Sequence, residues 1–134
     1  MTGFKSLEEA QAFFSGDRFA TESGMSLDEL DESHAVTSVT IGARHRNAIG
    51  GVMGGAIFTL ADFAFAALTN DRERAVVAQQ VSISYLAAPK GERLVATARY
   101  RKDGRSSCVV NVDVADETGR DVAQFVGTGF KLRG

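Results

Sequence analysis

The sequence predicts an α+β domain in which an antiparallel sheet wraps around one long central helix, with short helices at the N-terminus. Residues 54–69 are apolar around nearly the whole circumference of a helix, and Asp62 is their only charged residue. That pattern is typical of a helix buried in a core. Three long alternating segments then follow with tight turns between them, which indicates an antiparallel meander. A sheet folded over one buried helix satisfies both patterns.

Composition places the chain among ordinary globular proteins. Its 134 residues suit one domain, residues 1–134, and its net charge of −2 argues against a nucleic-acid surface. One cysteine excludes an internal disulfide, and there is no charged-then-apolar leader, so we expect a cytoplasmic protein. The helix at 54–69 spans roughly 24 Å and is flanked by glycines, which predicts no membrane span.

The N-terminal segment predicts two short helices. Residues 6–15 carry an apolar stripe, with Ser6 as N-cap and Glu9 three residues later, the pattern of a capping box. Asp17 is expected to cap a second short turn that continues to about Glu22.

Strands account for most of the remaining chain. β-Branched residues, alternation and turn dipeptides, among them Asp103-Gly104, define their ends. The predicted strands are 25–31, 34–42, 75–86, 93–102, 105–115 and 121–132. Alternation predicts that Val77, Val81, Ile83 and Tyr85 share one face of their strand, and that Val122, Gln124, Val126, Thr128 and Phe130 share one face of theirs.

The chemistry is concentrated around the long helix. Gly54 and Gly55 stand at its start, where backbone N–H groups have no partner inside the helix and can serve as an oxyanion hole. Asp62 is a carboxylate on a buried helix, which must be paired, protonated or facing a cavity with a function. The alternatives are a tight glycine turn packed on the sheet, and an aspartate that caps a loop or bonds a buried amide.

Helix geometry separates these two features. Asp62 lies eight residues after Gly54, so it is roughly 12 Å further along the same helix. A carboxylate so far away cannot act on a carbonyl held at its own helix N-terminus. If both serve one reaction, Asp62 must meet the glycines of a second copy, and two antiparallel helices related by a two-fold axis would form that site twice. The prediction is a homodimer.

The order of residues in this stretch resembles a known family. Asn47, Gly50, Met53-Gly54-Gly55 and Leu60-Ala61-Asp62 are similar to the hotdog-fold thioesterases of the phenylacetate-degradation (PaaI-like) type. The family pattern is Asn-x-x-Gly-x-x-His-Gly-Gly followed by Leu-Ala-Asp, and all spacings match. Met53 stands where the family has histidine. The resemblance covers nearly the whole chain and implies the hotdog fold.

The resemblance implies an acyl-CoA thioesterase acting on short, medium or aromatic acyl groups, as a homodimer that doubles to a tetramer. It assigns Asp62 as general base or nucleophile, the amides of Gly54 and Gly55 as oxyanion hole, and Asn47 as the group that orients water or the carbonyl. Met53, His45, Phe58 and Arg105 are the expected substrate-binding residues. Arg105 belongs to a set of cations near strand ends that could meet the phosphates of coenzyme A, although such a set is more often a solvated face. The set comprises Lys90, Arg93, Arg101, Lys102 and Arg105.

Several alternatives remain at this point. Phe13, Phe14 and Phe19 are implied pocket walls, or else a lid over the core. A non-catalytic acyl-ligand binder with the same groove is the second functional hypothesis, and Met53 favours it. A hotdog hydratase is the third, and the absence of a histidine close behind Asp62 speaks against it. No histidine, cysteine or carboxylate cluster has metal-ligand spacing, so neither a metal nor another cofactor is expected.

Overall fold

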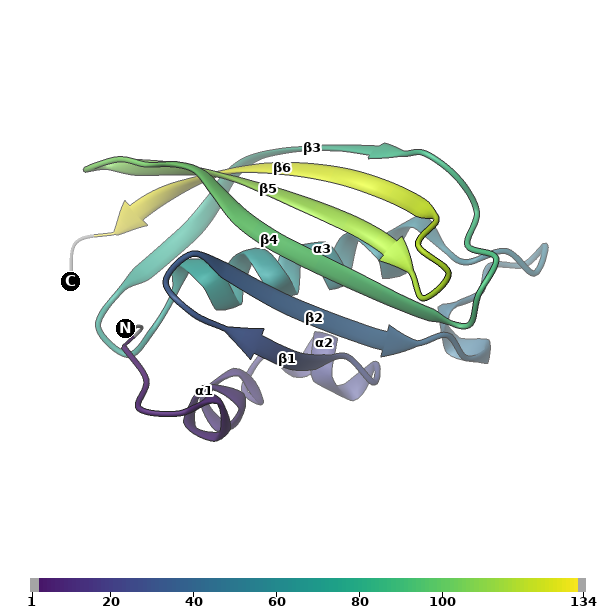
Figure 1. Ribbon diagram of the computed structural model, residues 1–134, viewed down its shortest axis with the longest axis horizontal. Coiled ribbons are helices and arrows are strands. Elements are labelled where there is room, and N and C mark those ends of the chain that lie inside the picture. Colours follow the sequence, from purple (N-terminus) through teal and green to yellow (C-terminus); the bar gives the residue numbers. More distant parts are fainter. Residues whose placement is uncertain (1–2, 133–134) are drawn as a thin grey trace.

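The computed structural model describes residues 3–132. Its sheet curves over one long helix, and two short helices lie beside the sheet edge formed by the first strands (Figure 1). The elements are α1 (Leu7–Phe14), α2 (Arg18–Glu22), β1 (Ser26–Leu30), β2 (His34–Thr40), a 3-10 turn η1 (Ala43–His45), α3 (Gly54–Thr69), β3 (Ala75–Tyr85), β4 (Arg93–Asp103), β5 (Ser107–Asp116) and β6 (Asp121–Leu132).

The sheet has the strand order β1-β2-β4-β5-β6-β3, and every neighbouring pair is antiparallel. Strands β4, β5 and β6 form the predicted meander. Strand β3 follows α3 and returns to the outside of β6, so it is an edge strand. The α+β architecture, an antiparallel sheet around one central helix, is confirmed.

The core lies between α3 and the concave face of the sheet. Phe65 of α3 is buried and packs on Phe125 of β6, with ring centroids 6.2 Å apart. Two glycines of β6 make room for it, because a Cβ at Gly127 or Gly129 would lie within 3.0 Å of the Phe65 ring. Replacing such a buried phenylalanine by alanine typically costs about 3–5 kcal/mol. This close packing fixes α3 against the sheet.

The N-terminal caps differ from the prediction in detail. Ser6 caps α1 by accepting the Glu9 N–H at 3.1 Å, but the Glu9 carboxylate pairs with Arg72 at 2.9 Å and does not complete a capping box. Asp17 stands at the N-cap position of α2, yet its side chain makes no capping hydrogen bond. Glu9 therefore pairs with Arg72, which is distant in the sequence, and not with the nearby backbone of Ser6.

One predicted strand face is wrong. A β-bulge in β3 between Ala78 and Gln80 inserts one residue opposite β6. Val76, Val81 and Ile83 pack on the core, whereas Val77 lies on the outer face and is 46% exposed. An inserted residue reverses the alternation of a strand. In β6, the alternation from Gln124 to Phe130 follows the prediction. Val122 does not share that face, because the register with β5 shifts between Asp121 and Ala123 and Val122 is buried.

Candidate active site

The N-terminal end of α3 is preceded by a loop that one asparagine holds in shape. The Asn47 side-chain oxygen accepts the backbone N–H groups of Ile49 at 3.1 Å and Gly51 at 3.0 Å. Gly50 has φ +88°, a backbone conformation that favours glycine. The Asn47 side-chain amide therefore directs its oxygen to the loop, which leaves its NH2 group available to a ligand.

The first two residues of α3 keep their backbone N–H groups uncapped. Met53 occupies the N-cap position and has no capping side chain. Its carbonyl accepts the N–H groups of Ala56 and Ile57 at 3.0 and 3.3 Å. Among residues 3–132 no acceptor pairs with the N–H of Gly54 or Gly55. Two donors thus stand free at the positive end of the helix dipole.

Tyr85 explains why the helix starts with glycine. Its hydroxyl donates to the Gly54 carbonyl at 3.0 Å, and a Cβ on Gly54 would lie 3.1 Å from the Tyr85 ring. A Cβ on Gly55 would lie 3.0 Å from the terminal methyl of Met53. Sequence spacing did not identify Tyr85 as a site residue. Its place at the end of a strand, on the same predicted face as Val81 and Ile83, could have indicated it.

A cavity of about 440 Å³ opens beside these glycines. Its walls are mostly apolar, and they bring together predicted and unpredicted residues. They include Phe19, Met25, His45, Met53, Gly55, Phe58, Thr59 and Tyr85. Of the three phenylalanines considered as pocket walls, Phe14 is buried in the core and Phe13 packs edge-on against it at 5.0 Å, whereas Phe19 lines the cavity.

His45 lines this cavity but is committed elsewhere. Its ring Nδ1 accepts the Gly42 N–H at 2.9 Å, which requires the proton on Nε2. Nε2 then donates to the Ser23 carbonyl at 2.6 Å. Both ring nitrogens are engaged and the residue is buried, so His45 ties the 3-10 turn to the segment after α2.

Asp62 faces a second cavity, of about 330 Å³, between α2 and α3. Its carboxylate is half-buried, and among residues 3–132 it has no hydrogen-bond or ion-pair partner. Burial, and secondly the charge of Asp17, raises the pKa of Asp62. The alternative in which Asp62 caps a loop or bonds an amide finds no support in these contacts.

The two cavities are neighbours that share Phe19, Phe58 and Thr59. The helix bounds predicted for α3 are confirmed, so Asp62 lies about 12 Å along the axis from Gly54. One chain therefore supplies the two free N–H groups of Gly54 and Gly55 and the unpaired carboxylate of Asp62 along two adjoining cavities. It does not bring the N–H groups and the carboxylate together.

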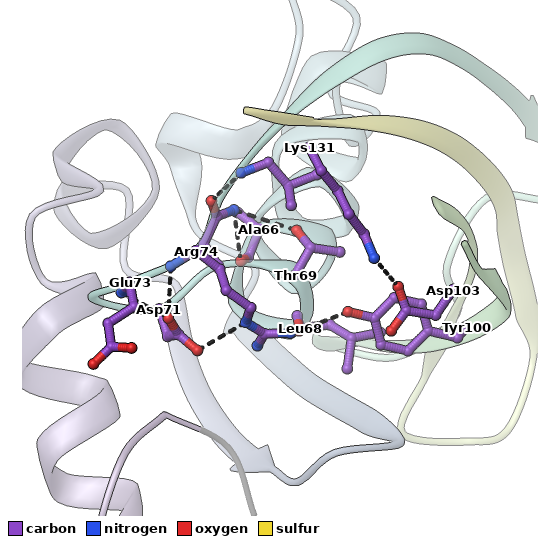
Figure 2. Close-up of polar contacts among 11 residues, drawn as sticks. Ala66, Leu68, Thr69, Asp71, Glu73, Arg74, Tyr100, Asp103 and Lys131 are labelled. Atoms are coloured by element: carbon purple, nitrogen blue, oxygen red, sulfur yellow. Dashed lines mark hydrogen bonds and ion pairs between the residues drawn. The ribbon is translucent and has the colours of Figure 1, made fainter. Parts of the chain in front are cut away.

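The opposite end of α3 is closed by side chains (Figure 2). The Asn70 amide donates to the Ala66 carbonyl at 3.1 Å, and its oxygen accepts the Val76 N–H at 2.7 Å. The Tyr100 hydroxyl donates to the Leu68 carbonyl at 3.3 Å. The Arg74 side chain points to Asp71, with a distance of 2.8 Å. Polar side chains thus bond two carbonyls of the last turn, those of Ala66 and Leu68, at the end where a helix leaves carbonyls without an internal partner.

Arg105 lies at this closed end. It lines a cavity of about 240 Å³ together with Thr69 and Lys131. In one chain it is therefore remote from Gly54 and the other predicted substrate-binding residues. Its assignment to coenzyme A stays a prediction. Among the described residues no three histidine, cysteine or carboxylate side chains come together as metal ligands, and no helix has the length and apolar character to cross a bilayer.

Known proteins are similar to this chain in sequence and in fold. Residues 49–123 match the model of the thioesterase superfamily. The acyl-coenzyme A thioesterase PaaI of Escherichia coli K12 is 31% identical over 131 residues, which cover 97% of this chain and 94% of that protein.

Solved structures agree with that similarity. The PaaI protein from the phenylacetic acid degradation operon of E. coli superposes with a TM-score of 0.87 at 30% identity, covering 95% of this chain and 93% of that one. A hypothetical thioesterase protein of Streptococcus pneumoniae TIGR4, solved with coenzyme A, superposes with a TM-score of 0.80 at 26% identity, covering 89% of this chain and 96% of that one.

Proposed function

Because this chain belongs to the thioesterase superfamily and is an acyl-CoA thioesterase with the hotdog fold, we propose that two subunits share its reaction centre. In each site, Asp62 of one subunit faces Gly54, Gly55 and Asn47 of the partner subunit. The family membership favours a hydrolase over the non-catalytic acyl-ligand binder.

One observation carries the proposal. The unpaired Asp62 carboxylate and the free N–H groups of Gly54 and Gly55 lie on the same helix about 12 Å apart. No change of side-chain rotamer can close that distance. A two-fold axis across two antiparallel copies of α3 would place each carboxylate at the other copy's glycines.

Exposed apolar residues support an assembly at this end of α3. Ile49 on the glycine loop is 93% exposed and Phe19 is 79% exposed. Met53, Tyr85 and Leu86 are also exposed, at 47%, 52% and 55%. Large apolar groups gathered in one region mark an interaction surface. Strand β3 adds an unpaired edge, which a second copy could extend into a continuous sheet. Doubling of the dimer to a tetramer stays a prediction.

The reaction is hydrolysis of a thioester to a carboxylic acid and a thiol. The substrate carbonyl oxygen accepts the N–H groups of Gly54 and Gly55, which stabilise the negative charge that develops there. Asp62 takes a proton from water as the water attacks the carbonyl carbon, or attacks that carbon itself to form an anhydride that water then hydrolyses. The C–S bond breaks, and the departing thiolate takes up a proton.

The remaining residues would bind the substrate. The free NH2 group of Asn47 can donate to water or to the carbonyl, and the apolar cavity beside Met53 and Phe58 suits the acyl group. The streptococcal relative was solved with coenzyme A, which supports a coenzyme A ester as the substrate here. Arg105 lies at the C-terminal end of α3, so it would have to reach the phosphates of coenzyme A from there.

Subunit mixing tests the shared site. Asp62→Asn removes the base, and Gly54→Pro removes one oxyanion donor. If the site is shared, a dimer with one of each variant contains one site with both defects and one intact site. Random mixing after denaturation and refolding should then restore about a quarter of the wild-type rate of thiol release from acyl-CoA esters.

The controls are each variant mixed with itself, which should show no recovery. A site within one chain predicts none in the hybrid either, since every chain then carries a defect. Light scattering that shows only monomer at micromolar concentration would also contradict the proposal.

A further inference from the structure

Asp17 has a carboxylate that its own helix does not use. The residue occupies the N-cap position of α2, and its backbone carbonyl accepts the N–H of Thr21 at 3.0 Å. Its side chain makes no capping bond, although aspartate at this position usually caps. Among residues 3–132 no other group pairs with it. The side chain is therefore left for another role.

This carboxylate lines the same cavity as Asp62. Asp17 enters from α2 and Asp62 from α3, and Phe19, Phe58 and Phe63 form apolar walls around them. Arg18 is the third charged residue of the cavity, but its guanidinium pairs with Glu22 at 2.6 Å. Arg18 is the only lysine or arginine among the described residues that line this cavity.

Other titratable groups also border α3 in the described residues. The Tyr85 hydroxyl bonds the Gly54 carbonyl and the Tyr100 hydroxyl bonds the Leu68 carbonyl. Arg44 and His45 line the neighbouring cavity beside Gly55. Burial and the Asp17 charge both raise the pKa of Asp62, and burial raises the pKa of Asp17. A general base is most effective when its pKa approaches the working pH, whereas an ordinary aspartate has a pKa of about 4.

We propose that Asp17, whose exposed carboxylate lines the same cavity as Asp62, is a positioning residue of the thioesterase reaction and makes Asp62 a stronger base toward water. This inference rests on the proposed function, because it requires Asp62 to react. A like charge in a partly apolar cavity disfavours a second ionised carboxylate. The proton that Asp62 accepts then relieves the repulsion between the two groups.

The test is the pH profile of kcat/KM for Asp17→Asn, which removes the charge with little change of shape. We expect the acidic limb to move to lower pH by about half a unit or more. We also expect the plateau rate to fall by about two-fold, because Asp62 becomes a weaker base. Asp17→Glu keeps the charge and should restore the limb toward the wild-type position.

Asp113→Asn is the matched control. Asp113 is exposed on β5 and pairs with Thr97 and Gln124 in the sheet register, outside the Asp62 cavity. The same chemical change there should leave the limb in place. Raising the salt concentration should shrink the effect of Asp17→Asn, since screening weakens charge interactions.

The outcomes separate this inference from the proposed function. An acidic limb that stays in place in Asp17→Asn, together with an inactive Asp62→Asn, overturns the role of Asp17 alone. Full activity in Asp62→Asn overturns the shared site and this inference with it. If Asp17→Asn lowers the melting temperature, Asp17→Ser supplies another neutral variant with a capping side chain, and an unshifted limb in that variant also rejects the proposal.

Discussion

The two ends of α3 are built in opposite ways. At its C-terminal end, Asn70 and Tyr100 bond the carbonyls of Ala66 and Leu68, and Asp71 pairs with Arg74. At its N-terminal end, Gly54 and Gly55 carry free N–H groups beside an open cavity. Both ends present groups that a helix cannot satisfy internally. Side chains bond carbonyls at the C-terminal end, whereas among the described residues no acceptor meets the Gly54 and Gly55 N–H groups. We therefore expect the closed C-terminal end to govern stability, and the N-terminal half of α3 from Gly54 to Asp62, the open half, to govern catalysis.

The largest expected effect is that of Asp62→Asn in the open half. Removing the base should lower kcat by about 10²- to 10⁴-fold. The fold should remain, because within residues 3–132 the carboxylate has no hydrogen-bond or ion-pair partner to lose, and it carries a desolvation penalty. Thiol release from acyl-CoA esters and a thermal melt would measure both. Near wild-type turnover would show that Asp62 has a structural role, and the contrast between the ends would then lose its catalytic half.

Gly54→Pro tests the free N–H directly. Proline is tolerated at the first helical position, and Met53, with φ −67° and ψ 135°, has a conformation that can precede it. We expect kcat to be about 100-fold lower than in Gly54→Ala. Alanine is the matched control, because it adds the same Cβ against Tyr85 but keeps the donor. Equal rates for the two variants would show that the Gly54 N–H does not act on the substrate.

Two asparagines sharpen the comparison between the ends. Asn70→Ala should lower the free energy of unfolding by about 1–3 kcal/mol, since it leaves the Val76 N–H without its acceptor. Asn70→Ala should leave kcat/KM unchanged.

Asn47→Ala in the exposed glycine loop should lower the free energy of unfolding by under about 1 kcal/mol. It should lower kcat/KM by about ten-fold, because it frees the loop that positions the site. Urea unfolding and steady-state kinetics on both variants test the crossed pattern.

Met53→His restores the side chain that the family pattern has at this position. Met53 borders an apolar cavity with Phe19 and Phe58, so we expect it to shape the acyl pocket. The imidazole should raise KM for esters with apolar acyl groups by a few-fold, which is roughly the effect of losing one or two methylene contacts. It should change kcat little. A clear rise in kcat would instead show that the reaction lacks a hydrogen-bond donor that histidine supplies.

The smallest expected effect is the response of stability to pH, which should differ in sign between Asp71 at the closed end and Asp62 in the open half. Burial acts to raise the pKa of Asp71, but hydrogen bonds from Glu73 and Arg74 outweigh it and lower that pKa. Asp71 therefore stabilises the fold above about pH 4, its unfolded value, and the contribution is lost as pH falls through the lower folded pKa. Asp62 has a raised pKa, so its ionised form opposes folding at neutral pH.

Melting temperatures against pH measure this difference. The stability advantage of Asp62→Asn over wild type should shrink as pH falls from 7 toward about 4. The deficit of Asp71→Asn should persist over that range and shrink only below it. Parallel curves for both variants would contradict the opposite environments of the two carboxylates.

Local sequence patterns determined much of this protein. The bounds of α3, the six strands in chain order and the Ser6 cap follow from periodicity, turn residues and capping chemistry, which act over a few residues. Helical rise alone also put Asp62 too far from Gly54 to serve the same carbonyl. Those inferences held because the local preferences and the final fold agree.

Only the tertiary structure decided which distant groups meet. The bulge that turns Val77 outward depends on the pairing of β3 with β6, and the commitment of both His45 nitrogens depends on Gly42 and Ser23. The position of Asp17 beside Asp62 depends on how α2 packs on α3. Spacing along the chain encodes the face of a helix or strand, but it does not encode which distant atom that face will meet.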